Sequence, residues 1–391
     1  MRWLTERKVR VRDELACTAC DRRWPEAERP VTCPACGGVL LVPRTVPEAF
    51  TPSTLPGLWR YASLLHAGRV QPPVTLGEGQ TPIVALPRWG ERAGLQRASA
   101  KLEFLTPTGS FKDRGAAVLV TRARELGVRR LVEDSSGNAG AAIAAYAARA
   151  GLPCTVYVPA ETPAVKLAQI AAVGARLVRV PGDREAVAAA AMADAADGAY
   201  YAGHNVNPYF VEGTRTFAFE VAEQFGFDPP EHVVMPVGGG ALYLGAWLGF
   251  TEWYRAGLLP RVPRLHIAQS TGCAPLVRAL AQGAEDAVPV ERAPTVASGV
   301  TIARPARARL ILRAARETGG RAAAVDDAAI RAEMAAVARL EGLTCEPTAA
   351  VAFAATRELV RIGAIAPEER VLIAVTGSGL KDSEALARAG A

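Results

Sequence analysis

One lysine lies in a segment whose residue types suit covalent catalysis by an amine. Lysine is scarce beside arginine in this chain, and Lys112 lies in the run Pro-Thr-Gly-Ser-Phe-Lys-Asp-Arg-Gly at 107–115. The proline and glycine predict a turn, and Ser110 is expected to cap a helix that begins at about Phe111. The positive end of a helix dipole favours an uncharged amine, which is the form that makes a Schiff base. Lys112 is therefore a candidate Schiff-base lysine, although a lysine near a helix start is usually only a solvated charge.

Two glycine-rich segments each follow a predicted strand and open a predicted helix. Backbone amides at such helix starts bind anions, so the first segment can receive a carboxylate and the second a phosphate. Neither segment fits the P-loop or the spaced-glycine dinucleotide pattern. One such loop is weak evidence, because glycine there often serves packing alone, but a lysine with two loops is a more specific combination. The segments are Ser135-Ser136-Gly137-Asn138-Ala139 and Gly238-Gly239-Gly240-Ala241-Leu242.

Four cysteines near the start of the chain have the spacing of a structural zinc site. Cys17 and Cys20 form one C-x-x-C pair, and Cys33 and Cys36 form a second. Each pair presents two thiolates from one turn, and two turns complete a tetrahedral zinc site. Redox dithiols or unrelated cysteines are the alternatives, and the doubled spacing favours zinc over both. The total of seven cysteines is odd, which suits a reducing compartment better than a disulfide framework.

The composition is that of a globular protein, with 50% hydrophobic residues and a net charge of +6 over 391 residues. Basic residues are scattered, so nothing favours a nucleic-acid partner. No apolar run approaches the roughly 20 residues that span a bilayer, and the stretch 187–196 is too short. The first eight residues lack the apolar core of a secretory signal. We therefore expect a cytoplasmic protein with no membrane partner and a small-molecule substrate.

Apolar, β-branched runs alternate with alanine-rich helical runs from about residue 97 onward. This alternation predicts parallel strands with helical crossovers, and thus an α/β fold. A proline-rich connector at about 43–56 separates the cysteine unit from the main body. The expected strands are 131–134, 154–158, 176–180, 233–236, 265–268 and 371–375, with helices at 139–150 and 163–173.

The segment around Lys112 resembles the signature of threonine synthases, which are tryptophan-synthase-β-like (fold type II) enzymes that use pyridoxal 5′-phosphate (PLP). The similarity covers nearly the whole chain, including the cysteine pairs and the runs 59–61, 76–82, 212–214 and 376–382. It implies two open, twisted, mainly parallel α/β domains behind an N-terminal zinc ribbon, and a homodimer. The expected domains are the ribbon at 1–45, a large PLP-binding domain at 46–115 and 206–391, and a small mobile domain at 116–205.

The resemblance also implies residue roles. Lys112 would carry PLP as a Schiff base and move the proton at the substrate α-carbon, and Asn138 would hydrogen-bond the cofactor's phenolic oxygen. Thr376 would face the pyridine nitrogen; a hydroxyl there suits elimination and replacement better than transamination. The implied cofactor-binding residues are Phe111, Lys112, Asn138, Gly238, Gly239, Gly240, Ala241, Leu242 and Thr376. The implied substrate-binding residues are Thr81, Ser135, Ser136, Ala139, His204, Asn205 and Phe210.

The stretch 204–210 departs from the family pattern. Threonine synthases usually have Asn-Ser-Val-Asn-Pro-x-Arg here, whose Asn, Ser and Arg help to bind the phosphate of O-phosphohomoserine, whereas this chain has His204, Asn205 and Phe210. Threonine formation from O-phosphohomoserine is the first functional hypothesis. The second is β-elimination or β-replacement on a non-phosphorylated amino acid, as in serine or threonine dehydratases or cysteine or cysteate synthases. A catalytically silent binding protein is the third.

Overall fold

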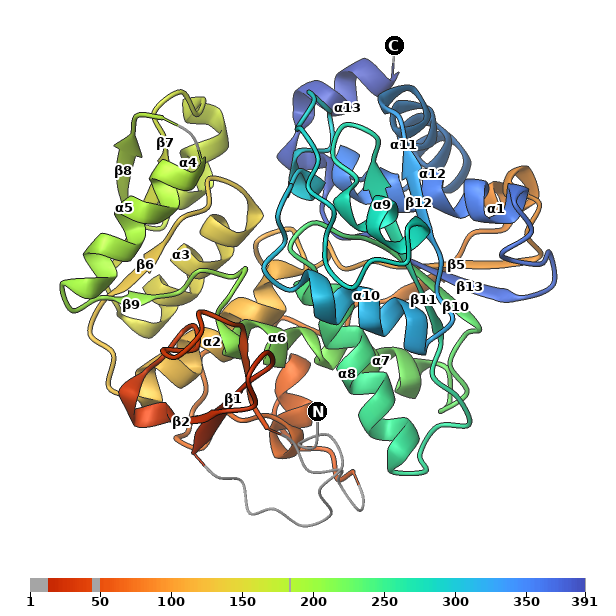
Figure 1. Cartoon of the computed structure of the whole chain (residues 1–391). Coiled ribbons are helices and arrows are strands. Elements are labelled where there is room, and N and C mark those ends of the chain that lie inside the picture. Colours follow the sequence, from red (N-terminus) through yellow and green to blue (C-terminus); the bar gives the residue numbers. More distant parts are fainter. Residues whose placement is uncertain (1–12, 44–49, 183, 391) are drawn as a thin grey trace. The chain divides into compact units, whose positions relative to one another are not determined.

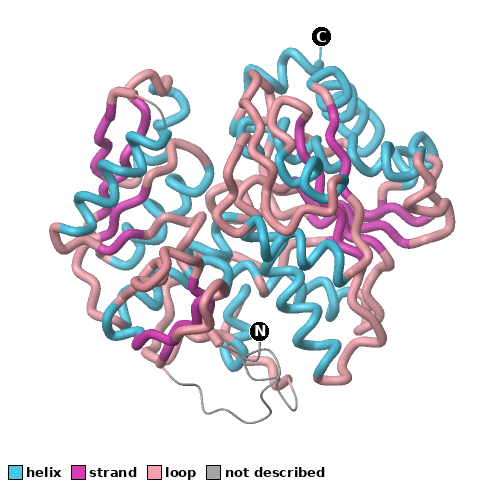
Figure 2. Tube along the Cα trace, in the orientation of Figure 1, coloured by secondary structure: helices cyan, strands magenta, loops and turns pink. Residues whose placement is uncertain are grey.

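The computed structural model describes residues 13–43, 50–182 and 184–390 (Figures 1 and 2). The N-terminal residues that were tested for a signal and part of the proline-rich connector lie outside them. The chain groups into two compact units, which are 1–80 with 112–217 and 81–111 with 218–391. The three-part division expected from the sequence stays a prediction. No helix in the described ranges is long and apolar enough to span a membrane.

The first unit begins with a small antiparallel sheet that carries the cysteine pairs. Its strands are β1 (Glu14–Cys17), β2 (Arg23–Pro25) and β3 (Leu40–Leu41), in the order β2-β1-β3. A 3-10 turn, η2 (Glu26–Glu28), follows β2, and η3 (Gly57–Leu64) lies later in the chain. Glu26 forms an ion pair with Arg122 and lies 2.8 Å from Nε2 of His66. This ion pair therefore connects the segment that follows β2 to helix α2 (Lys112–Glu125), which contains Arg122.

A parallel four-stranded sheet forms the rest of the first unit, in the order β8-β7-β6-β9. Helices α3 and α5 pack on β7, and α2 packs on α3 and α6. The buried run of β6 and the alanine-rich α3 follow the predicted alternation, and α3 ends at Gly151 with φ 68°. The strands are β6 (Leu131–Glu133), β7 (Cys154–Pro159), β8 (Arg176–Val180) and β9 (Tyr200–Tyr201). The helices are α2 (Lys112–Glu125), α3 (Asn138–Ala150), α4 (Ala164–Ala172), α5 (Arg184–Ala196) and α6 (Pro208–Thr214).

The second unit contains a six-stranded sheet in the order β12-β11-β10-β13-β5-β4, and only the edge strand β4 is antiparallel. The α/β prediction is confirmed. The strands are β4 (Ile83–Ala85), β5 (Arg97–Lys101), β10 (His232–Pro236), β11 (Arg264–Ser270), β12 (Ala322–Val325) and β13 (Arg370–Ala374). The helices are α1 (Pro87–Ala93), α8 (Ala241–Arg255), α9 (Pro275–Ala281), α10 (Ala308–Glu317), α11 (Asp327–Glu341), α12 (Pro347–Arg361) and α13 (Ser383–Gly390). Helix α7 (Thr216–Gln224) begins in the first unit and continues into the second, which resumes at Ala218.

The main core of the second unit lies between this sheet and the helices α1, α11 and α12. Trp89 of α1 is fully buried, and its ring contacts Phe353 of α12 edge-on at 5.0 Å between centroids. Its indole Nε1 donates to Glu333 Oε2 at 2.7 Å, so the polar edge of the ring is also satisfied. The short turns η4 (Ser298–Val300) and η5 (Gly379–Lys381) lie outside these helices in the sequence.

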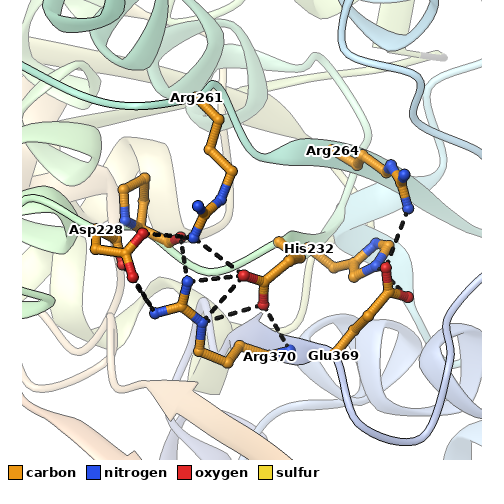
Figure 3. A network of polar contacts seen from close by, with 8 residues as sticks. Asp228, His232, Arg261, Arg264, Glu369 and Arg370 are labelled. Carbon is orange, nitrogen blue, oxygen red and sulfur yellow. Dashed lines mark hydrogen bonds and ion pairs between the residues drawn. The ribbon is translucent and has the colours of Figure 1, made fainter.

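An ion-pair network lies at the amino ends of β10, β11 and β13 (Figure 3). Arg370 donates from Nη2 to Glu231 Oε1 at 2.7 Å and from Nε to Glu231 Oε2 at 3.0 Å. It also pairs with Asp228 at 3.0 Å, and Arg261 lies 3.0 Å from Glu231. The hydrogen bonds and charge of Arg370 lower the pKa of Glu231 to about 2. These contacts stabilise the end of the sheet at which the amino ends of β10, β11 and β13 lie.

Glu231→Gln is expected to lower the free energy of unfolding by about 1–2 kcal/mol at pH 7, because it removes a charge-assisted bidentate contact that water partly screens. The folded pKa of Glu231 lies below its ordinary value of 4.5. The stabilisation is therefore present above pH 4.5 and is lost as the pH falls towards 2. Denaturant unfolding of both proteins at pH 7 and pH 3 measures it. Glu317→Gln, in the exposed α10 pair with Arg313, is the control with a smaller effect. An undiminished difference at pH 3 would contradict the assignment.

Candidate active site and metal site

Lys112 is the first residue of α2, as predicted to within one residue. The turn before it is closed by a bond from Gly109 N to Thr106 O at 2.9 Å, and Gly109 has φ 81°. The prediction that Ser110 caps the helix is wrong. Its buried hydroxyl has no hydrogen-bond partner in the described ranges, so it satisfies none of the amides of α2. The chain just before Lys112 is held by backbone bonds instead.

Thr376 lies next to that backbone attachment in the second unit. The amide of Phe111 donates to Thr376 O at 3.1 Å, and Ser110 and Gly377 form a β-bridge. Thr376 is 2% exposed, and its Oγ1 has no hydrogen-bond partner among the residues described. Leaving a buried hydroxyl unsatisfied costs about 1–3 kcal/mol. An unsatisfied hydroxyl beside the residue that precedes Lys112 fits a site that receives a polar ligand atom.

The glycine loop of the second unit follows β10 and opens α8. A Cβ on Gly238 would lie 2.6 Å from Gly299 O, and a Cβ on Gly240 would collide with Ile311. Gly240 also has φ 77°, which disfavours other residues. Ala241 and Leu242 start the 15-residue α8, so the positive end of the helix dipole lies at this loop. This loop can hold an anion with backbone donors alone.

The other glycine loop belongs to the first unit and follows β6. The amide of Gly137 donates to Ser135 Oγ at 3.3 Å, and Asn138 begins α3. A Cβ on Gly140 would collide with Ser135 O, so α3 approaches the loop closely. Ser135 and Ala139 are buried, whereas Ser136 and Asn138 are partly exposed. The loop thus offers hydroxyls and helix-start amides, and its binding of a carboxylate stays a prediction.

His204 lies just after β9, and its imidazole Nδ1 lies 2.9 Å from Glu133 Oε1 at the end of β6. Both residues are buried. Burial raises the pKa of the Glu133 carboxyl well above its usual range, and repulsion from Asp134 raises it further. The positive charges of Arg184 and Lys112 oppose this increase in pKa. Sequence reasoning selected His204 but missed Glu133.

Phe210 is fully buried in α6. A Cβ on Gly115 would lie 2.5 Å from the Phe210 ring, so the ring packs against α2 one turn after Lys112. The ring also contacts His204 edge-on at 5.8 Å between centroids. Phe210 therefore touches both the lysine helix and His204. Asn205, in the turn after His204, is partly exposed.

Thr81 lies in a buried polar network of the second unit. Its hydroxyl donates to Glu103 Oε1 at 2.7 Å, and its carbonyl accepts from Lys101 Nζ at 2.6 Å. Lys101 also donates to Glu220 at 2.9 Å and to Gln224 at 2.8 Å. The backbone and the side chain of Thr81 are thus both fixed. The scarcity of lysine was the one sequence signal that pointed to Lys101.

The four N-terminal cysteines converge in the first unit. Their sulfurs all lie within 4.8 Å of one another, and the cysteines are not paired as disulfides. Cys17 and Cys36 are 3.5 Å apart at sulfur, and Cys20 and Cys33 are 3.7 Å apart. Zinc–sulfur bonds of about 2.3 Å imply tetrahedral edges of roughly 3.8 Å, so the donor set fits zinc. A Cβ on Gly38 would lie 3.0 Å from the Cys17 sulfur, which is closer than an ordinary contact, so glycine suits this position.

Comparison with known proteins identifies the family. The profile described as pyridoxal-phosphate dependent enzyme matches residues 74–377. The chain is 36% identical to the threonine synthase of Methanosarcina acetivorans over 376 residues, which covers 95% of this chain and 92% of that protein. The chain belongs to the threonine synthase family of PLP-dependent enzymes. The threonine synthase of Mycobacterium tuberculosis strain H37Rv is 37% identical over 343 residues, covering 87% and 92% of the two chains.

Solved structures agree on the fold of this family member. The processed form of threonine deaminase isoform 2 from Solanum lycopersicum superposes with a TM-score of 0.69 at 21% identity, covering 89% of this chain and 99% of that one. Maize serine racemase gives 0.67 at 22% identity, covering 78% and 91%. The predictions of a PLP-dependent lyase and of its cofactor are confirmed. The unsatisfied Thr376 hydroxyl and the glycine loop at 238–240 fit that cofactor.

Proposed function

We propose that this enzyme binds PLP through Lys112 and breaks a carbon–oxygen bond in an amino-acid substrate. The observation that carries the proposal is the buried, unsatisfied hydroxyl of Thr376, whose backbone accepts the amide of the residue preceding Lys112. The amides of 238–242 would hold the cofactor phosphate, Phe111 would contact its ring, and Asn138 would hydrogen-bond its phenolic oxygen. When bound, PLP supplies the electron sink that makes the substrate α-hydrogen acidic.

The chain's own groups would bind the substrate and move its protons. The hydroxyls of Ser135 and Ser136 and the first amides of α3, including that of Ala139, would hold the substrate carboxylate. This contact places the α-hydrogen for the amine of Lys112, which takes that proton and can return it. The hydroxyl of Thr81, which already donates to Glu103, can accept a hydrogen bond from the substrate.

O-Phosphohomoserine is the first candidate substrate. The enzyme would eliminate its phosphate and add water to give threonine. This candidate is supported by the name of relatives that are 34–37% identical over most of the chain. It requires that this protein bind the substrate phosphate with Phe210 in the place where the family usually has an arginine.

A second candidate is a β-elimination or β-replacement on a non-phosphorylated amino acid, and the geometry of 204–210 favours it. Phe210 is buried against α2 and donates nothing to an anion. His204 is hydrogen-bonded to a carboxyl group, and Asp134 stands beside that group in the chain. The acidic side chain of Asp134 has a carboxyl oxygen within 4.8 Å of a ring nitrogen of His204, which disfavours a phosphate dianion and accepts a less charged leaving group. Asn205 would contact the same end of the substrate.

We expect the unmodified enzyme to use O-phosphohomoserine poorly. Losing one charge-assisted contact to phosphate lowers kcat/KM by roughly tenfold or more. The measurement is kcat/KM for O-phosphohomoserine, L-serine, L-threonine and O-acetyl-L-serine under one set of conditions, with phosphate, ammonia and threonine as readouts. A higher kcat/KM for O-phosphohomoserine than for the other three would contradict the second candidate and leave the first.

We also propose that Cys17, Cys20, Cys33 and Cys36 bind one structural zinc ion. The sulfur spacings support this, and four thiolates leave no open position for catalysis. The resemblance supports a homodimer and a domain division into 1–45, 46–115 with 206–391, and 116–205, and we propose a cytoplasmic location from the composition and cysteine content. Analytical ultracentrifugation of the PLP-loaded protein tests the dimer.

A further inference from the structure

Glu133 and His204 are brought together by the sheet rather than by the sequence. β6 and β9 are parallel neighbours, with Leu131 opposite Tyr200. Glu133 is the last residue of β6, and His204 follows β9 by a short turn. Both side chains therefore emerge at the carboxyl ends of parallel strands, where α/β enzymes bind ligands. The loop proposed to hold the substrate carboxylate starts two residues after Glu133.

The role of the imidazole Nε2 depends on how many protons the hydrogen-bonded pair holds. Glu133 Oε1 lies 2.9 Å from Nδ1 of His204. When the pair holds two protons, the shared proton lies either on Nδ1 or on the carboxyl, and Nε2 carries a hydrogen and is a donor in both arrangements. When the pair holds one proton, Nδ1 donates to the carboxylate and Nε2 is an acceptor. Glu133 can replace the proton at Nδ1 when Nε2 loses its own.

The surroundings of Glu133 favour the form of this pair that holds two protons. Its second oxygen, Oε2, is buried without a hydrogen-bond partner in the described part of the chain. Burial raises the pKa of the carboxyl, so the pair releases its proton reluctantly to bulk water. Three charged groups shift the pKa of Glu133, namely Asp134, Arg184 and Lys112. Glu133 in turn raises the pKa of Cys154 and of Tyr201.

We propose that His204, positioned by Glu133, is the general acid that protonates an oxygen leaving group. This inference rests on the second substrate candidate. As the Cβ–O bond breaks, its electron pair stays on oxygen, and the Nε2 proton of His204 converts a hydroxyl to water or an acyloxy group to a carboxylic acid. The electron pair of the Cα–H bond, whose proton Lys112 takes, forms the new carbon–carbon double bond. The imidazole then regains a proton from Glu133 or from solvent.

Leaving groups that need no proton provide the test. The PLP-loaded full chain and its His204→Asn variant are compared on L-serine and on β-chloro-L-alanine, whose chloride departs unprotonated. We expect kcat/KM for serine to fall by roughly 100-fold or more, and that for β-chloroalanine to change less than about threefold. Glu133→Gln, which keeps the side-chain size, is expected to give the same split with a smaller loss on serine, and its pH–rate profile should lose the limb that reports this acid.

Equal losses on both substrates in Glu133→Gln would show that the pair only supports the fold and would overturn the proposal. Retention of full serine activity in either variant would overturn it as well. The failure of the substrate proposal has a different signature. In that case the unmodified enzyme eliminates chloride from β-chloroalanine and turns over O-phosphohomoserine, but releases nothing from serine, threonine or O-acetylserine. Such an enzyme does not use the hydroxyl and acyloxy leaving groups that His204 is proposed to protonate, which would refute the acid role too.

Discussion

Lys112→Ala is expected to abolish turnover while the protein keeps its fold. The loss should reach roughly 10³-fold or more, because Lys112 is proposed both to hold the cofactor and to move the α-proton. The fold should persist because Lys112 is only partly buried at the start of α2, whereas the core of that helix lies further along. Alanine is also a good helix former. Steady-state assays on the preferred substrate and far-UV circular dichroism measure the two effects.

Lys166→Ala is the matched control, since Lys166 is an exposed lysine in α4 of the same unit. It should retain nearly full activity and the same spectrum. The glycine loop at 238–242 remains in Lys112→Ala, so this variant should still bind added PLP, but reversibly. Residual turnover within tenfold of the unmodified enzyme would be inconsistent with a catalytic role for Lys112.

Loss of the proposed zinc ion is expected to have the largest effect on stability. Cys17→Ser should reduce the zinc content from about one ion per chain to near zero and lower the melting temperature, because structural zinc contributes on the order of 10 kcal/mol to small zinc domains. Cys17 is fully buried, so the change also leaves a hydroxyl in a sulfur-lined core. Elemental analysis and thermal unfolding measure the two results. Activity per folded molecule should fall less than stability, since none of the residues proposed for catalysis lies in the small sheet.

Cys273→Ala provides the control, because Cys273 is equally buried but lies outside the cysteine cluster. It should keep its zinc. The small sheet is fastened to α2 through the ion pair of Glu26 with Arg122, so a chelator that removes zinc should loosen this contact as well. Zinc content unchanged in Cys17→Ser, or a disulfide among these cysteines in reduced protein, would contradict the metal assignment.

The sequence predicted features that depend on local pattern. The apolar runs of β7 and β8 and the alanine-rich α3 were predicted to within one residue because each is set by its own residues and flanking glycines. The convergence of the cysteines was also predictable, since each C-x-x-C turn presents two thiolates and two such turns together form a four-sulfur site. The start of α2 was predicted to within one residue, yet the reason given for it, a Ser110 cap, was wrong.

Features that depend on strand order could not be read from the sequence. Glu133 meets His204 only because β9 pairs with β6. The fixing of Thr81 requires Lys101, which reaches it across the β4–β5 pair. Phe210 was chosen because it replaces an arginine, and only packing shows that its ring lies on Gly115. In each case the partner lies many residues away, and the pattern of apolar and polar residues along the sequence does not reveal the contact.

Reduction with borohydride followed by peptide mapping tests the central claim most directly. The PLP-loaded enzyme, treated with borohydride and digested, should give about one pyridoxyl group per chain on the peptide that contains Lys112. The same treatment of Lys112→Ala should give none. A stable adduct on Lys101, Lys166 or Lys381, or no adduct on the unmodified enzyme, would contradict the account.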